Sequence, residues 1–248
     1  MELISEELKN YLIKYCDPEN RLLKKIDRET NLKVSMPRML SGHYQGRVLS
    51  MLSKMIAPER ILEIGTFTGY ATLCLAEGLT ENGKIHTIDV NAELEDMVKA
   101  SFSKSPHKAK IVYHIGDATK LIPGLAEVFD IVFIDADKKN NGTYYNIVID
   151  KLRSGGIIIV DNVLWSGKVL EETCMSLPVI QKNEHKVMPA WPVGRQTSLP
   201  IKNKLNSNEK IDQNTIIIAN FNEMVMKDQR VEKLILPVRD GLFVIRKK

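Results

Sequence analysis

Two apolar runs of the sequence end in side chains that carry oxygen. FIDADKKN places Asp135 directly after one run, and GIIIVDNVLWSG places Asp161 and Asn162 after another. The carboxyl ends of neighbouring parallel strands meet at one edge of a sheet, so these side chains converge if the two strands are neighbours. Two carboxylates and an amide carbonyl suit Mg²⁺, Ca²⁺ or Mn²⁺ better than zinc. The pattern predicts a divalent metal site, whereas either aspartate alone would more simply be solvated or cap a helix.

A lysine lies close to the first of these carboxylates. Lys138 follows Asp135 by three residues. A nearby cation disfavours the charged form of a lysine and lowers its pKa, so the neutral amine becomes available as a general base. We therefore name Lys138 and Asp135 as candidate catalytic residues. Asp137 is expected to face a bound cofactor, and Lys139 to be a surface charge.

The stretch ILEIGTFTGYATL is typical of a strand, a glycine turn and a helix start. Gly65 and Gly69 allow a ligand to approach the backbone, and Asp89, twenty residues after Gly69, ends the next predicted strand. A carboxylate there accepts both hydroxyls of a ribose. The turn lacks the Gly-x-Gly-x-x-Gly pattern and the P-loop lysine, and Glu63 would repel phosphates.

A cationic nucleoside such as S-adenosylmethionine therefore fits this turn better than NAD or ATP. The GDA motif, Gly116, Asp117 and Ala118, follows the third predicted strand and supports a nucleoside site. An ordinary strand-to-helix turn with an exposed aspartate is the alternative.

Alternating strand and helix patterns separate these motifs. Strands are predicted at 60–64, 84–89, 110–115, 129–135 and 155–161. Helices are predicted at 2–15, 18–29, 43–56, 70–79, 92–103, 143–152 and 214–227. Two β-rich runs around Asp240-Gly241 predict a final antiparallel hairpin. The expected fold class is α/β, a Rossmann-like doubly wound, seven-stranded, mostly parallel sheet with an antiparallel C-terminal hairpin and N-terminal helices.

We expect a single domain over residues 1–248, with N-terminal helices in 1–57 and a long insertion in 172–212. The insertion contains four prolines and runs rich in asparagine and lysine. Loops of this length are uncommon in compact domains, so a lid, a partner contact or a solvated insertion is expected, with Trp191 as a possible anchor.

Composition excludes several classes of protein. The chain has a net charge of +4 with both signs interspersed, and no nucleic-acid motif is present. There is no apolar run of membrane-spanning length and no apolar signal core at the N-terminus, so a cytoplasmic protein is expected. Three widely spaced cysteines predict neither a disulfide framework nor a metal pair.

Taken together, LEIGTFTGY, IDV, GDA, FIDADK and VDNVLWSGKV resemble the cation-dependent class I S-adenosylmethionine O-methyltransferases. This is the family of catechol and caffeoyl-CoA O-methyltransferases, and the chain looks most like its small bacterial members. The resemblance runs from about Arg38 to Gly167 and from Asn214 to the C-terminus.

The resemblance implies roles for individual residues. Asp135, Asp161 and Asn162 match the ligands of one divalent cation, with Mg²⁺ expected and Ca²⁺ or Mn²⁺ as alternatives. Lys138 matches the base of the catechol enzymes. Ala118 would lie beside the adenine and Asp137 near the methionine moiety. The candidate cofactor-binding set is Met39, Ser41, Glu63, Gly65, Thr66, Gly69, Asp89, Gly116, Asp117, Ala118, Asp135 and Asp137.

The resemblance also implies a small phenolic acceptor, S-adenosylhomocysteine as product and a homodimer. Ser166 stands where plant caffeoyl-CoA enzymes usually carry asparagine, so specificity for an acyl-CoA stays open. Catechols, other phenols, flavonoids and hydroxylated antibiotics all remain candidates. A non-catalytic nucleoside-binding or scaffold protein is an alternative, but it would be expected to have lost the metal trio or the base.

Overall fold

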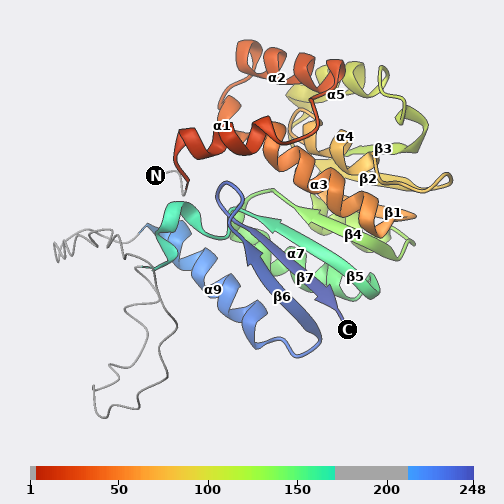
Figure 1. The fold of residues 1–248 in the computed structure, drawn as a ribbon. Coiled ribbons are helices and arrows are strands. Elements are labelled where there is room, and N and C mark those ends of the chain that lie inside the picture. Colours follow the sequence, from red (N-terminus) through yellow and green to blue (C-terminus); the bar gives the residue numbers. More distant parts are fainter. Residues whose placement is uncertain (1–3, 171–211) are drawn as a thin grey trace.

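The structure is a computed structural model, and it describes residues 4–170 and 212–248. Its centre is a seven-stranded sheet with the order β3-β2-β1-β4-β5-β7-β6 (Figure 1). The strands are β1 (Arg60–Ile64), β2 (Lys84–Asp89), β3 (Ile111–Ile115), β4 (Phe129–Ile134), β5 (Leu152–Asp161), β6 (Val231–Leu236) and β7 (Leu242–Lys247). Strands β1 to β5 are parallel, and β7 pairs antiparallel with β5 and β6. The predicted fold class is therefore confirmed, including the neighbouring positions of β4 and β5.

Both faces of the sheet are apolar and covered by helices, because successive side chains of a strand point to opposite faces. Ile61 and Ile131 belong to the core under the N-terminal helices, whereas Leu62 and Val132 belong to the core on the other face. The first core contains residues of α2 (Arg21–Lys33), α3 (Gly42–Ile56), α4 (Tyr70–Ala76) and α5 (Glu95–Phe102). The second contains residues of α6 (Ala118–Leu121), α7 (Asn141–Ile149) and α9 (Gln213–Lys227).

Several element boundaries differ from the sequence prediction. The first helix, α1 (Glu6–Lys14), begins later than predicted, after Ser5, whose hydroxyl accepts a hydrogen bond from Leu8 N. Helix α2 continues to Lys33 because buried Leu23, Ile26 and Thr30 extend its apolar face. Strand β5 begins at Leu152, which pairs with Phe129 of β4, and the register between the two strands shifts after this pair. Because β5 begins early, α7 ends earlier than predicted, at Ile149.

Helices α3 and α4 approach each other closely through small residues. A Cβ added to Gly46 would lie 2.8 Å from both Cys74 Sγ and Tyr70 Cε1. Beside this contact, Arg47 donates two hydrogen bonds to Glu77, at 3.0 and 2.7 Å. Hydrogen bonds, chiefly from Arg47, hold the pKa of Glu77 down at about 2 against the opposing effect of its burial. Helix α3 is therefore fixed to the helix that follows the glycine turn.

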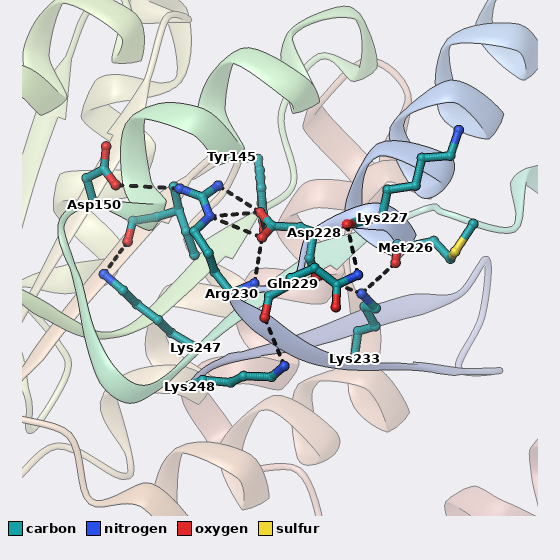
Figure 2. Close-up of polar contacts among 11 residues, drawn as sticks. Tyr145, Asp150, Met226, Lys227, Asp228, Gln229, Arg230, Lys233, Lys247 and Lys248 are labelled. Carbon is teal, nitrogen blue, oxygen red and sulfur yellow. Dashed lines mark hydrogen bonds and ion pairs between the residues drawn. The ribbon is translucent and has the colours of Figure 1, made fainter.

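Lysine side chains cap two helices on the far side of the sheet. Lys247 Nζ donates to the carbonyl of Ile149 at the end of α7, at 2.7 Å. Lys233 Nζ donates to Met226 O and Asp228 O at the end of α9, at 2.6 and 2.9 Å. Figure 2 shows these lysines around Asp228. Positive charge at a helix C-terminus is favourable, so this basic cluster serves the fold.

The expectations about membrane helices, cysteines and the long insertion are tested only where the described residues cover them. No described helix is long and apolar enough to cross a membrane. Cys16 and Cys74 are free thiols within the described part of the chain. The predicted insertion lies outside the described residues except for Asp212, and so does Trp191. The single-domain organisation stays a prediction.

We expect Glu77→Gln to lower the free energy of unfolding by about 1–3 kcal/mol at pH 7. The reason is that two largely buried hydrogen bonds donated by Arg47 lose their charged acceptor. The depressed pKa of Glu77 gives stability that is present above the unfolded pKa of 4.5 and is lost as pH falls toward about 2. Thermal melting at pH 7 and pH 3 should therefore show a smaller difference between variant and wild type at pH 3. Glu81→Gln is the matched control on an exposed glutamate. An equal difference at both pH values would contradict the assignment.

Candidate active site

The ends of three parallel strands bring the predicted motifs to one edge of the sheet. Gly65 N donates to Ile88 O at 2.9 Å, and Asp135 N donates to Ile64 O at 2.8 Å. Gly65 has a φ of +103°, and a Cβ placed on it would lie 2.2 Å from Asp135 O. No side chain fits at position 65, so the glycine turn lies against the backbone of the loop that carries Asp135.

The rest of the turn is fixed from both sides. Gly69 has a φ of +82°, and a Cβ there would lie 2.5 Å from the ring of Phe102. Thr66 shares a 2.6 Å hydrogen bond with Thr87 on β2. Asp89 accepts from Phe67 N at 2.7 Å and from Asn91 N at 2.9 Å, one bond on each carboxylate oxygen. A carboxylate accepts about four hydrogen bonds, so two positions remain for a pair of hydroxyls.

Glu63 is fully buried beneath this turn. Its Oε2 accepts hydrogen bonds from Thr72 and, at 2.5 Å, from Thr87, whereas its Oε1 is buried without a partner among the described residues. Burial, opposed by these hydrogen bonds and reinforced by Asp135 and Asp89, raises the pKa of Glu63 to about 8. The side chain is therefore largely protonated at neutral pH, and Glu63 supports the turn from below as a neutral acid.

The third loop contributes a helix start. Gly116 N donates to Asp89 O at 2.8 Å, which joins this loop to the end of β2. Asp117 caps α6 by accepting from Thr119 N at 2.9 Å and from its hydroxyl at 2.7 Å. Ala118 is buried. The structure thus gives Asp117 a capping role, which the motif alone does not reveal.

A short segment before α3 closes the opposite side. Met39, in the 3₁₀ turn η1 (Pro37–Met39), is half exposed, and Ser41 is buried. A small cavity of about 10 Å³ is lined by both of them together with Gly65, Thr66 and Asp135. The structure therefore gathers five predicted cofactor residues from three separate segments around one cavity.

The predicted metal residues lie at the ends of β4 and β5. Asp161 is buried. Its burial, and secondly the negative charge of Asp135, raise the pKa of Asp161 above its usual range. Asp161 Oδ2 accepts from Gln45 Nε2 at 2.8 Å, and Oδ1 accepts from Asn162 N at 2.7 Å. Asn162 has a φ of +64°. Two carboxylates and an amide thus gather at one edge of the sheet.

Lys138 provides a positive charge at this edge. Its Nζ lies 3.0 Å from Asp135 Oδ1, and both side chains are largely buried. Asp137 accepts from Tyr144 OH at 2.7 Å and from Asn140 Nδ2 at 2.8 Å, and its place beside the cofactor stays a prediction. Lys138 and Asp135 are therefore paired, as their spacing predicts.

The donor set fits a hard divalent cation. Within residues 4–170 and 212–248, no group of three or more His, Cys, Asp or Glu side chains could hold a metal, and the predicted trio contains only two carboxylates. Its third member is an amide. Lys138 pairs with Asp135, and the positive charges of Lys138 and Arg239 both act on Asp161. Carboxylate and amide oxygens are the ligands that Mg²⁺, Ca²⁺ or Mn²⁺ prefers.

Two residues of this site were missed in the sequence analysis. Gln45 reaches Asp161 from α3, and Arg239 donates to the carbonyls of Leu40 and Ser41 from the turn between β6 and β7. Neither residue belongs to a recognisable motif. The only sequence signal was the register of α3, which places Gln45 one turn before buried Leu49.

Comparison with known proteins gives the chain its family. The family model described as "O-methyltransferase" matches residues 14–188 and 199–248. The chain belongs to this O-methyltransferase family. The resemblance stated from the sequence is thereby confirmed, and so is the expectation that the protein is a methyltransferase enzyme.

Individual relatives agree with the family assignment. A caffeoyl-CoA O-methyltransferase of Stellaria longipes is 28% identical over 254 residues, which cover 99% of this chain and 92% of the relative. A catechol O-methyltransferase of Mycobacterium tuberculosis is 34% identical over 139 residues, covering 56% of this chain and 63% of the relative. An O-methyltransferase structure from Bacillus cereus, in complex with SAH, shares the fold with a TM-score of 0.77 at 23% identity, covering 98% of this chain and 97% of that one.

We expect Glu63→Gln to change how stability depends on pH. The raised pKa of Glu63 means that ionising it in the folded state is unfavourable, so wild-type stability falls as pH rises from the unfolded pKa of 4.5 to about 8. A glutamine at this position stays neutral. Thermal melting from pH 5 to pH 9 should show the melting temperature of the variant rising relative to that of the wild type until about pH 8. Above that pH the difference between the two should stay constant. Parallel melting curves over that range would contradict this account of Glu63.

Proposed function

We propose that the protein transfers the methyl group of S-adenosylmethionine to a hydroxyl of a small phenolic acceptor, with a divalent cation held by Asp135, Asp161 and Asn162. The observation that carries the proposal is the contact between Gly65 and the backbone of Asp135. It puts the nucleoside turn and the carboxylate pair side by side. A donor on the turn and an acceptor at the carboxylates would therefore meet.

The glycine turn provides the donor side of this proposal. Asp89 has acceptor capacity left for the two ribose hydroxyls, and Gly65 leaves the backbone accessible. Met39 and Ser41 would contact the donor from the other side of the same small cavity. The Oε1 of Glu63, buried next to this turn without a partner among the described residues, is a hydrogen-bonding atom that a polar ligand group could use.

The acceptor side rests on the carboxylate pair. A divalent cation bound there would supply the positive charge that favours the ionised form of a phenol, whose ordinary pKa is about 10. The side chain of Gln45 and the backbone N–H of Asn162 fix the orientation of the Asp161 carboxylate before any ligand arrives. The relatives whose names specify caffeoyl-CoA and catechol support an acceptor with vicinal hydroxyls.

The chemical step is a displacement at the methyl carbon. Lys138 Nζ would take the phenolic proton, because a bound cation disfavours the charged form of a neighbouring lysine. The phenolate oxygen then forms the new bond to the methyl carbon while the carbon–sulfur bond breaks, and its electron pair stays on sulfur. S-adenosylhomocysteine and a methoxy aromatic result, and alignment of oxygen, carbon and sulfur supplies much of the acceleration. The homodimer and the cytoplasmic location stay predictions.

We expect Asp161→Ala to reduce methyl transfer by orders of magnitude while S-adenosylmethionine binding, measured by calorimetry, changes little. The variant loses one of two charged oxygen ligands but keeps the glycine turn. Chelator should have the same effect on the wild type, and added Mg²⁺ should reverse it. Asp150→Ala removes an exposed aspartate and is the matched control. Full transfer in excess chelator, tested over vicinal and isolated phenols, would refute the metal site.

We expect Lys138→Met to slow methyl transfer by about 10²-fold or more, because a general base typically contributes 10²–10⁴-fold. The loss should shrink as pH rises toward the pKa of the phenol, since the acceptor then ionises without help. The measurement is kcat against pH with one catechol, and Lys139→Met is the control on the adjacent lysine. If the two variants lose activity equally at every pH, Lys138 is not the base.

A further inference from the structure

The turn between β6 and β7 reaches the segment that precedes α3. Arg239 Nη1 donates to Leu40 O and Ser41 O, both at 2.6 Å, and Nη2 donates to Arg38 O at 3.0 Å. Figure 1 shows the turn of this hairpin directed toward the N-terminal helices. One guanidinium thus holds three carbonyl oxygens of the segment that carries Met39.

The same turn also holds the loop that follows β5. Asp240 O accepts from Leu164 N at 2.9 Å, and Asp240 Oδ1 accepts from Ser166 N. Gly241 O accepts from Val163 N at 3.3 Å, and a Cβ on Gly241 would lie 2.5 Å from Leu164 Cγ. The turn therefore joins the segment on the donor side to the loop on the metal side.

Arg239 makes these contacts from a strained backbone. Its φ is +50°, a region that favours glycine and is uncommon for a residue with a side chain. A glycine would adopt this conformation freely but would lose all three hydrogen bonds. Such strain persists where the surrounding structure holds the residue in place, and it often marks positions with a functional constraint.

We propose that Arg239 is a positioning residue for the methyl donor. It holds residues 38–41 at a fixed distance from the loop after β5, so that Met39 and Ser41 keep their places around the cavity beside Gly65. The inference rests on the proposed function, because it places the donor against the segments that line this cavity. Arg239 does not line the cavity beside Gly65, and it acts on the cavity through the backbone of residues 38–41.

Three variants separate the contacts from the strain and from charge. Arg239→Gln removes the guanidinium, and Arg239→Gly removes it while relieving the backbone. Arg246→Gln removes an exposed arginine of the same hairpin, whose ion pair with Glu232 lies away from the site. For each, we would measure amide hydrogen exchange in residues 36–45, the affinity for S-adenosylhomocysteine by calorimetry without added metal, and KM and kcat for S-adenosylmethionine.

Both Arg239 variants should exchange faster in residues 36–45 and bind S-adenosylhomocysteine about three- to tenfold more weakly, the usual size of a lost hydrogen-bonding group. KM should rise by a similar factor with a smaller change in kcat, because bound donor reorders the segment. Arg239→Gly should melt no lower than Arg239→Gln, and Arg246→Gln should match the wild type in every measurement.

Unchanged exchange in both Arg239 variants would overturn the inference. Faster exchange with unchanged affinity would also overturn it, because the residue would then be purely structural. If the wild type binds no S-adenosylhomocysteine, the proposed function fails, and the exchange comparison alone then shows whether Arg239 holds the segment.

Discussion

The contact between the backbone at Gly65 and the carbonyl of Asp135 is the constraint on which the site depends. It requires β1 and β4 to be neighbours in register, with Ile64 opposite Ile134, so that both strands end at the same level. It also requires a residue without a Cβ, since even one added carbon would lie 2.2 Å from Asp135 O. The backbone of the turn and the backbone at Asp135 consequently keep a fixed separation that is set by the sheet.

Acidic side chains lie close together at this edge of the sheet, and their mutual repulsion is offset in a different way at each of them. Glu63, Asp89, Asp135 and Asp161 influence one another, and burial raises the pKa of both Glu63 and Asp161. Glu63 responds by keeping its proton. Asp89 is stabilised by two backbone amides, and Asp135 by Lys138. Within the described part of the chain, a neutral amide side chain and one backbone amide donate directly to Asp161, and the positive charges of Lys138 and Arg239 also act on it. An edge at which carboxylates gather in this way is suited to a cationic ligand, whether a sulfonium or a metal.

The sequence predicted those parts of the site that a strand pattern places. Asp135, Asp161 and the glycine turn each follow an apolar run, so knowledge of strand order was enough to bring them together. Gln45 contacts Asp161, 116 residues away, and Arg239 contacts Ser41, 198 residues away. No local sequence pattern predicts contacts over such separations. The capping role of Asp117 was also hidden, because a Gly-Asp-Ala motif is compatible with either a ligand contact or a helix start. Local periodicity identifies strand ends, whereas residues that orient those ends are identified by packing.

The distribution of backbone strain shows which parts are held by packing. Of the seven described non-glycine residues with positive φ, six lie in segments around the site: Met36, Phe67, Asn162, Trp165, Ser166 and Arg239. The exception, Ala57, ends α3 in the ordinary left-handed conformation of a helix terminus. Strained residues persist where neighbouring contacts determine their conformation. Here Phe67 N is held by Asp89, Ser166 N by Asp240 in the hairpin turn, and Arg239 by the carbonyls of residues 38–41. A methyl transfer that depends on alignment gains most from a frame of this kind, because the ordering has already been done by folding when the ligands arrive.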